Sequence, residues 1–229
     1  MGGPRKTTVA MRSIRSALVT VALSATAVTG ALLAAPLTAS AAPAAVAGMV
    51  GPVDSKAIAA DARRVLDDLH VAVSTGDPVI RSWFEAERDL LAAAVAGPLR
   101  IEPARMQAAW ASADTAHQIA VLAALTQLGV PYRHNTSVAN SGFDCSGLTT
   151  YAWGVAGVRL TRQSRSQIQE ATAVASASAQ AGDLVYYPGH VSMYLGVDRA
   201  IVHAVGTGRF VEIGFTRTGK SVKFANPEG

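Results

Sequence analysis

The strongest constraint on the fold is a change of hydrophobic period near Asp183. Between residues 54 and 171, apolar side chains recur at the three- and four-residue spacing of amphipathic helices. From Asp183 onward they alternate with polar side chains every second residue, as in strands that bury one face. Helices followed by consecutive strands predict an α+β domain with an antiparallel sheet.

Residues 54–97 are predicted to form a short antiparallel pair of helices. The first helix should stop near Gly76, and Asp77-Pro78 provides a capping carboxylate and a proline at the first position of the second. Gly97-Pro98 is the expected end of that helix. Charged side chains such as Arg88 are expected on the solvated face. The pair is either a regulatory or docking segment for the following domain or a simple packing spacer.

The remaining elements follow from the same patterns. Helices are expected after Glu102-Pro103 and Asp114-Thr115 and over residues 145–156 and 163–171, and strands over 184–187, 190–195, 200–205, 210–216 and 221–224. The last two strands are expected to be joined through Thr218-Gly219. Residues 133–142 are predicted to be a polar loop, and residues 172–181 a loop rich in alanine and serine.

The first 41 residues have the three parts of a secretory signal peptide. A basic segment over residues 5–15 precedes an uncharged stretch over 16–35, and Ala39-Ser40-Ala41 forms a small-x-small cleavage signal. We expect cleavage after Ala41, followed by a small-residue linker over residues 42–53. The alternative is an uncleaved anchor, since the apolar stretch approaches the ~20 residues that span a bilayer. The cleavage signal favours export.

The basic character of the sequence comes from this leader. Its four basic residues account for the net charge of +4, so residues 42–229 carry 16 basic and 16 acidic side chains. A neutral mature chain lacks the electrostatic footprint of a nucleic-acid-binding protein. It also gives no sign of attraction to anionic lipid.

Cys145 is the only cysteine in the sequence and begins a predicted helix. It cannot form a disulfide within this sequence, so in an exported protein it is either a reactive thiol or an intermolecular link. A thiol becomes a strong nucleophile as the thiolate, which a nearby imidazole or a helix N-terminus favours. The sequence places Cys145 at such a terminus.

The histidines supply candidates for the imidazole. His70 and His117 are expected to be partly buried polar residues of helices, and His134 lies in the loop before the cysteine. His190 opens one predicted strand, and His203 lies in the middle of the next. If these strands pair, one imidazole takes the thiol proton and the other orients the first. The alternative for either histidine alone is a core residue that bonds to backbone.

Several motifs in a fixed order then point to a family. They are residues 129–132, 143–148, 160–167, 182–187, 189–196 and 202–204. In content, order and spacing they resemble the NlpC/P60 cysteine peptidases, with 45 residues from Cys145 to His190 and 13 from His190 to His203. The resemblance covers about residues 115–225 and leaves out the helical pair.

The resemblance implies a papain-like α+β domain whose nucleophile helix packs on an antiparallel sheet. The expected organisation is a helical segment over residues 54–112 and a catalytic domain over 113–229. Family members cleave stem peptides of bacterial peptidoglycan, often between D-glutamate and a diamino acid. No metal or other cofactor is implied. We therefore expect a secreted or cell-wall protein whose partner is the stem peptide, with no nucleic acid, no membrane after signal cleavage, and a monomeric state.

The resemblance also assigns roles to residues. Cys145 is the nucleophile, His190 the general base and then acid, and His203 the group that orients His190. Tyr132 places its hydroxyl near the oxyanion. Positions expected around the peptide groove are Asp144, Ser146, Arg162 and Ser164. The family commonly has an aromatic residue and a glycine pair where this chain has residues 133–136, so the resemblance does not fix the substrate preference.

Two other functions use the same residues. The fold can serve as a cell-wall-binding module that docks peptidoglycan without turnover. Alternatively, the acyl group can pass to an amine instead of water, which would make the protein an acyltransferase. The helical pair could also shield the cleft in a latent form.

Overall fold

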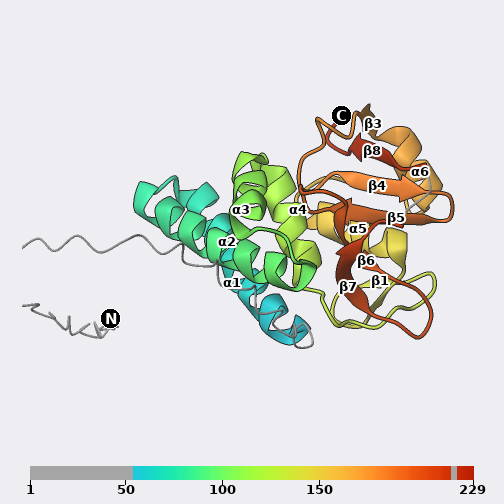
Figure 1. The fold of residues 1–229 in the computed structure, drawn as a ribbon, viewed down its shortest axis with the longest axis horizontal. Helices are drawn as coiled ribbons and strands as arrows, with labels where there is room; N and C mark the ends of the chain where they lie inside the picture. The colour runs from blue at the N-terminus through green and yellow to red at the C-terminus, as the bar shows by residue number, and fades with distance from the viewer. Residues whose placement is uncertain (1–53, 218–220) are drawn as a thin grey trace, which may run out of the picture. The chain divides into compact units, whose positions relative to one another are not determined.

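The computed structural model describes residues 54–217 and 221–229. The predicted signal peptide (1–41) and linker (42–53) lie outside the described residues. The architecture is α+β, as the change of period predicts (Figure 1). The helices are α1 (Ser55–Thr75), α2 (Pro78–Leu99), α3 (Pro103–Ser112), α4 (Thr115–Leu125), α5 (Cys145–Val155) and α6 (Ser164–Glu170). Within the described ranges, no helix is both long and apolar enough to cross a membrane.

Acidic side chains start five of these helices. The carboxylates of Asp54, Asp77, Glu102, Asp114 and Asp144 accept hydrogen bonds from backbone N–H groups of the first turns of α1 to α5. Such caps satisfy donors that have no partner inside a helix. Local sequence signals therefore explain where the helices begin.

Helix α2 continues beyond its predicted stop. Pro98 lies in its last turn, and the helix ends at Leu99, with Arg100 in the left-handed region (φ 55°). The proline removes one helical hydrogen bond. Leu99 is nevertheless buried, so packing of the last turn outweighs the local stop signal.

Arg88 on α2 is also placed differently from the prediction. Its side chain is buried rather than solvated. The guanidinium bonds to the neighbouring Asp89 at 2.9 Å and lies over the ring of Phe84. The ion pair with Asp89 and the aromatic face of Phe84 offset the energetic cost of burying this charge.

The sheet has six antiparallel strands in the order β3-β8-β4-β5-β6-β7. The strands are β3 (Thr172–Val174), β4 (Leu184–Tyr187), β5 (His190–Tyr194), β6 (Ala200–Ala204), β7 (Val211–Phe215) and β8 (Lys223–Asn226), and a separate pair consists of β1 (Ser137–Val138) and β2 (Gly142–Phe143). The four strands from β4 to β7 are neighbours in chain order. This part of the sheet agrees with the prediction.

The edges of the sheet differ from the prediction. Strand β8 does not pair with β7 but returns beside β4 and pairs on its other side with β3. The predicted loop 172–181 therefore begins with a strand, and the predicted loop 133–142 contains β1 and the first residue of β2. These short strands lack an alternating apolar pattern, because pairing with a distant segment, not local preference, defines them.

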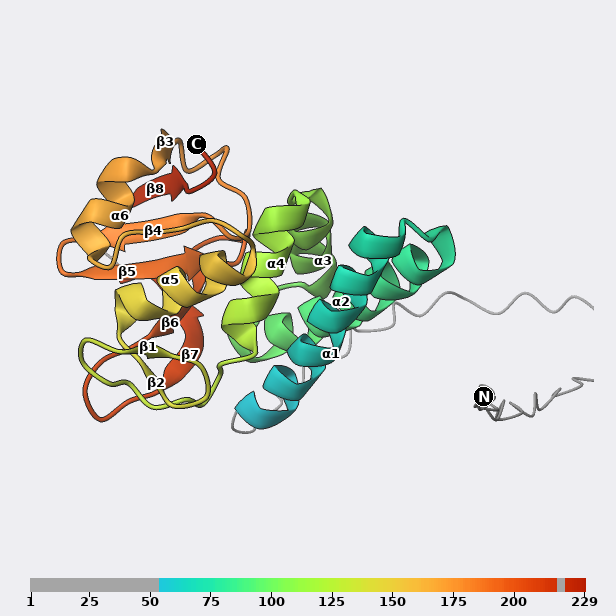
Figure 2. The same ribbon diagram turned by 180° about the vertical axis from the view of Figure 1, so that it is seen from behind.

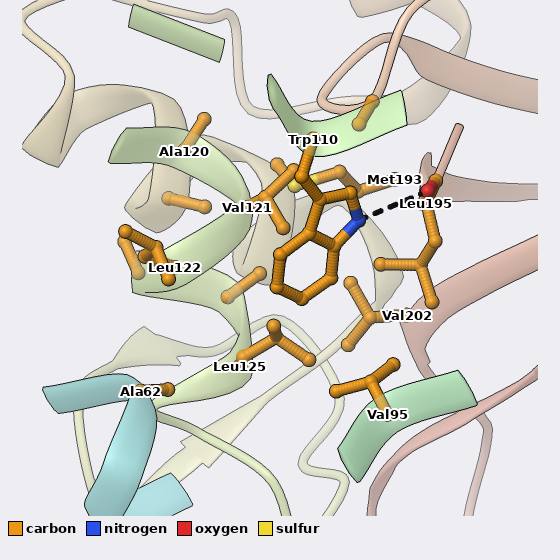
Figure 3. Packing of buried hydrophobic residues seen from close by; sticks show 14 of the residues in the cluster. Ala62, Val95, Trp110, Ala120, Val121, Leu122, Leu125, Met193, Leu195 and Val202 are labelled. Atoms are coloured by element: carbon orange, nitrogen blue, oxygen red, sulfur yellow. Dashed lines mark hydrogen bonds between the residues drawn. The ribbon is translucent and has the colours of Figure 1, made fainter. Parts of the chain in front are cut away.

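One hydrophobic core joins the helical segment to the sheet. Trp110 of α3 lies at its centre, and its indole N–H donates to the carbonyl of Leu195 at 3.1 Å. Figure 3 shows this indole between Val95 of α2, Leu125 of α4 and Val202 of β6. Helices α1 to α3 thus belong to the same hydrophobic core as the sheet. The boundary between residues 112 and 113 stays a prediction.

His117 of α4 forms a buried polar junction. It is fully buried, whereas His70 is exposed. Its Nε2 lies 3.1 Å from Oδ1 of Asp183, and its Nδ1 lies 2.8 Å from Oδ2 of Asp114. Burial alone lowers the pKa of His117, but the hydrogen bonds with both carboxylates outweigh burial and leave the pKa raised. The imidazole of His117 therefore links α4 to Asp183 at the start of β4.

Helix α5 carries the predicted nucleophile against the sheet. It packs on β5 and β6 and contacts α4 on another side. Figure 2 shows α5 and α6 together in front of the sheet. Trp153 of α5 is fully buried, and its indole N–H donates to the carbonyl of Gly182 at 3.2 Å. This packing fixes the helix whose first residue is Cys145.

Candidate active site

Cys145 is the first residue of α5 and is partly exposed. The chain enters the helix from the buried Phe143 of β2. Asp144 caps the helix, and its Oδ1 accepts a hydrogen bond from the N–H of Gly147 at 2.7 Å. A buried anchor on one side and a cap on the other hold the thiol at a helix N-terminus, where the helix dipole favours an anion.

The loop before Cys145 packs tightly on this terminus. The carbonyl of Thr136 accepts from the N–H of Asp144 at 3.0 Å, and the hydroxyl of Ser137 donates to the carbonyl of Gly147 at 2.7 Å. A Cβ atom at position 147 would lie 2.1 Å from the carbonyl oxygen of Thr136. Only glycine permits this approach, so Gly147 lets loop and helix form one rigid edge.

Arg162 lies in the same edge and is paired with the helix cap. Its two terminal nitrogens each lie 2.8 Å from an oxygen of Asp144, and one donates to the hydroxyl of Ser146 at 2.9 Å. Burial raises the pKa of Asp144, but the guanidinium and the N–H of Gly147 outweigh it, and the pKa is lowered. The carboxylate therefore stays ionised, and Arg162 compensates its charge next to the thiol.

His190 and His203 come together across β5 and β6. Nε2 of His190 lies 2.9 Å from Nδ1 of His203, and the two rings are perpendicular with centroids 5.1 Å apart. Tyr187, which pairs with His190 across β4 and β5, stacks on the imidazole of His190. The bond and the stacking hold the ring of His190 in one orientation.

Both histidines are neutral at ordinary pH. Burial, helped by His203 and Arg217, lowers the pKa of His190 to about 3. Burial also lowers the pKa of His203 to about 4, because Arg209 and Arg217 add to it and the nearby Glu212 only partly opposes it. A neutral imidazole has a lone pair available for a proton.

A cleft of about 360 Å³ opens over Cys145. Its described lining residues are Tyr132, His134, Asn135, Asp144, Cys145, Ser146, Arg162, Gln163, Ser164, Arg165 and Gly189. Six of the eight predicted site residues are among them. The other two are the histidines. His190 directly follows Gly189 and begins β5, and His203 lies on the neighbouring strand β6. Among the described residues, none of those that line the cleft comes from α1 or α2.

The thiol and the histidine pair are not bonded to each other. Within the described ranges, no hydrogen bond joins Cys145 to His190 or to His203. The sulfur is near enough to Tyr187, the ring stacked on His190, to raise the pKa of that tyrosine as a minor contribution after burial. The arrangement provides a sulfur at a helix start and an oriented imidazole at one cleft.

Tyr132 also lines this cleft. Burial raises the pKa of its hydroxyl, and the adjacent Cys145 and Asp144 add to the shift. The hydroxyl therefore keeps its proton at neutral pH and is a hydrogen-bond donor beside the sulfur.

The model of the NlpC/P60 family matches residues 129–222, which contain all eight predicted site residues. Residues 129–222 are an NlpC/P60 domain. The match begins between α4 and β1 and ends at the residue before β8. The helical pair lies outside it.

Relatives of this NlpC/P60 domain have names that describe hydrolases. A probable endopeptidase of Corynebacterium glutamicum is 37% identical over 110 residues, which are 47% of this chain and 51% of that protein. Peptidoglycan endopeptidase RipB of Mycobacterium tuberculosis is 39% identical over 102 residues, 38% of this chain and 42% of that protein. Gamma-DL-glutamyl hydrolase of Bacillus subtilis is 31% identical over 111 residues, 44% of this chain and 27% of that protein.

The chain thus spans about half the length, or less, of these relatives. Among solved structures, the P60 domain from the Mycobacterium avium paratuberculosis antigen MAP1272c is 26% identical. It matches with a TM-score of 0.44 and covers 52% of this chain and 96% of that one.

One residue of the NlpC/P60 domain supports the site without having been predicted to do so. The side chain of Gln167 in α6 is buried. Its amide nitrogen donates to the carbonyls of Ser146 and Thr161 and to the hydroxyl of Thr150. Its oxygen accepts from Thr149 at 2.7 Å. Gln167 is the last residue of the segment 160–167, which carries part of the family resemblance. This resemblance is the sequence signal that could have identified Gln167.

Proposed function

We propose that this protein is an exported cysteine endopeptidase that hydrolyses peptidoglycan stem peptides. The observation that carries the proposal is the hydrogen bond between His190 and His203 at the edge of a cleft that opens on Cys145. A nucleophile, a base and a group that orients the base are the minimum for covalent acyl transfer. The names of the relatives support the same chemistry.

In the proposed reaction, Nδ1 of His190 accepts the thiol proton while the sulfur of Cys145 attacks the carbonyl carbon of the scissile amide. The C–N bond then breaks, His190 gives the proton to the leaving amine, and the acyl group stays on sulfur as a thioester. Water loses a proton to His190 and attacks the thioester. This step releases the carboxylic product and returns the proton to the sulfur.

The proposed role of His203 follows from its bond to His190. When Nε2–H of His190 donates to Nδ1 of His203, the other ring nitrogen of His190 carries the lone pair that accepts the thiol proton. His203 thereby selects the tautomer and the orientation of the base, as a carboxylate does in other triads.

The oxyanion is proposed to bind to Tyr132 and to the first turn of α5. The hydroxyl of Tyr132 is a donor because its pKa is raised. Backbone N–H groups in the first turn of a helix have no intrahelical partner and suit a developing negative charge.

Three residues expected around the peptide groove have a proposed structural role instead. The polar atoms of Asp144, Ser146 and Arg162 already bond to one another and to the backbone of α5. We propose that these three residues maintain the shape and the charge balance of the cleft wall. Ser164, which is half-buried at the start of α6, is the proposed contact with the peptide backbone.

The proposed scissile bond joins D-glutamate to a diamino acid. RipB is named a peptidoglycan endopeptidase, and the Bacillus subtilis relative is named a gamma-DL-glutamyl hydrolase. The first name supports a peptide of peptidoglycan as the substrate, and the second supports a glutamyl bond. The proposed organisation is the one the sequence predicts: a signal peptide over residues 1–41, a linker over 42–53, a helical segment over 54–112 and a catalytic domain over 113–229, acting as a monomer outside the cytoplasm.

The test digests purified muropeptides with protein 42–229 and with its Cys145→Ala variant, followed by mass spectrometry of the products. New glutamyl termini with the wild-type chain and none with the variant are expected. Equal product profiles would exclude the peptidase. Products extended by an added amine would indicate an acyltransferase.

A thiol probe distinguishes the peptidase from a non-catalytic binding module. An activated Cys145 should react with iodoacetamide quickly near neutral pH, and His190→Ala should slow it. Binding of muropeptides without labelling or cleavage would indicate the binding module.

A further inference from the structure

A second groove adjoins the cleft along α6. Its volume is about 410 Å³, and its described lining residues are Arg165, Ile168, Gln169, Tyr186, Pro188, Ser221 and Lys223. Arg165 lines both hollows, and Pro188 of the groove is followed in the chain by Gly189 of the cleft. The two hollows therefore meet at Arg165 and at Pro188-Gly189.

The groove contains two cations without partners. Arg165 and Lys223 are both exposed, and in the part of the chain that the structure describes the side chain of neither forms a hydrogen bond or an ion pair. Two other arginines near the site differ in this respect, since Arg162 is paired with Asp144 and Arg209 with Glu212. No carboxylate is among the described lining residues of the groove. The positive charge is therefore available to a ligand.

The frame around these cations is fixed. Lys223 of β8 lies directly across from Tyr186 of β4 in the sheet register. Arg165 lies in α6, which Gln167 bonds to α5. Between them, Ile168, Tyr186 and Pro188 provide apolar wall. A cation on each element and an apolar wall suit a short peptide that carries an anionic group.

We propose that this groove binds a free carboxylate of the peptide substrate through Arg165 and Lys223. The proposal rests on the proposed function, since stem peptides are short and carry carboxylates along their length, whereas ordinary peptides present neutral amides at most positions. Guanidinium and ammonium groups bind carboxylates through charge-assisted hydrogen bonds. The groove thus selects carboxylate-bearing peptides over their amidated forms.

The kinetic test uses a stem peptide with all carboxylates free and versions in which each carboxylate is amidated singly. Arg165→Gln and Lys223→Gln should each raise KM for the free peptide about tenfold, with kcat nearly unchanged. Amidation at one position should raise KM for the wild type to the same level and remove the effect of both substitutions. Arg81→Gln, which removes an exposed charge from α2, serves as the matched control.

A binding test keeps this inference separate from the proposed reaction. Calorimetry with Cys145→Ala and the free peptide should show affinity that falls about tenfold when Arg165→Gln is added. Equal KM and equal affinity for the Arg165, Lys223 and Arg81 variants would overturn the proposal that the groove binds a carboxylate. The proposed peptidase activity would not be affected by that result. If wild-type protein cleaves no peptide but the calorimetric difference persists, the peptidase fails and the carboxylate site stands.

Discussion

Nε2 of His190 lies 2.9 Å from Nδ1 of His203, although the two residues are 13 positions apart on neighbouring strands. In a neutral pair, one of these nitrogens donates and the other accepts. Donation by His190 leaves its second nitrogen as the acceptor. The bond between two side chains thus sets which atom of His190 faces the reaction.

His203→Ala should lower kcat/KM about 100-fold or more, because the base loses its orientation and its tautomer preference. His203→Asn should retain most of the activity, since its amide oxygen can accept the proton of His190. Steady-state kinetics on one muropeptide checks both variants. Equal losses for alanine and asparagine would show that His203 acts only by filling space.

The pH dependence of kcat/KM should lack an acid limb near pH 6.5, the ordinary pKa of histidine. The pKa values of His190 and His203 are lowered to about 3 and about 4, so both imidazoles stay neutral as the pH falls through 6 and 5. Activity should fall only near pH 4. An acid limb centred near pH 6.5 would contradict this prediction.

The same histidines should make the fold sensitive to acid. A histidine with a lowered pKa in the folded state contributes stability above its unfolded pKa, and that stability is lost as the pH falls toward the folded value. The loss should reach about 2 kcal/mol at pH 4.5 for His190. Urea unfolding at pH 7 and pH 4.5 measures it, and His190→Gln should reduce the difference.

Local signals in the sequence point to Cys145, His190 and His203, whereas the resemblance to the NlpC/P60 family supplies the other five predicted site residues. Cys145 follows a capping aspartate, and His190 and His203 lie in strands with a clear two-residue period that pair as neighbours. Gln167 and the return of β8 beside β4 were not predicted, because both depend on contacts between segments far apart in the chain. The same reason explains the burial of Arg88, which helical periodicity alone places at the surface.

Removal of Arg162 should make the thiol less reactive. Arg162→Gln leaves the ionised Asp144 uncompensated beside Cys145, and a neighbouring negative charge disfavours the thiolate. The rate of iodoacetamide labelling at pH 7 should fall about fivefold. Asp144→Asn in the same chain should restore most of the rate, because asparagine still caps the helix without charge.

Gln167→Leu should destabilise the fold by about 3 kcal/mol, since the carbonyls of Ser146 and Thr161 and the hydroxyl of Thr149 lose their bonds to its side chain. Chemical denaturation measures the loss. Gln169→Leu, on the exposed side of the same helix, is the control and should change stability by less than about 0.5 kcal/mol. Similar losses for the two variants would rule out the hydrogen-bond network as the cause.

His117 should affect stability on the alkaline side, opposite to His190. Its pKa is raised in the folded state by Asp183 and Asp114, despite its burial. Its contribution is therefore fully present below the unfolded pKa of about 6.5 and is lost as the pH rises through the folded value. His117→Gln should destabilise the protein more at pH 6 than at pH 9.

Comparing the wild type and His117→Gln at each pH cancels the titration of His190 and His203, because both chains share it. Gln can still donate to one carboxylate, so the variant tests charge more than packing. An equal loss of stability at pH 6 and pH 9 would mean that His117 is neutral in the folded protein. A larger loss at pH 6 would identify it as the buried cation that holds α4 to the start of β4.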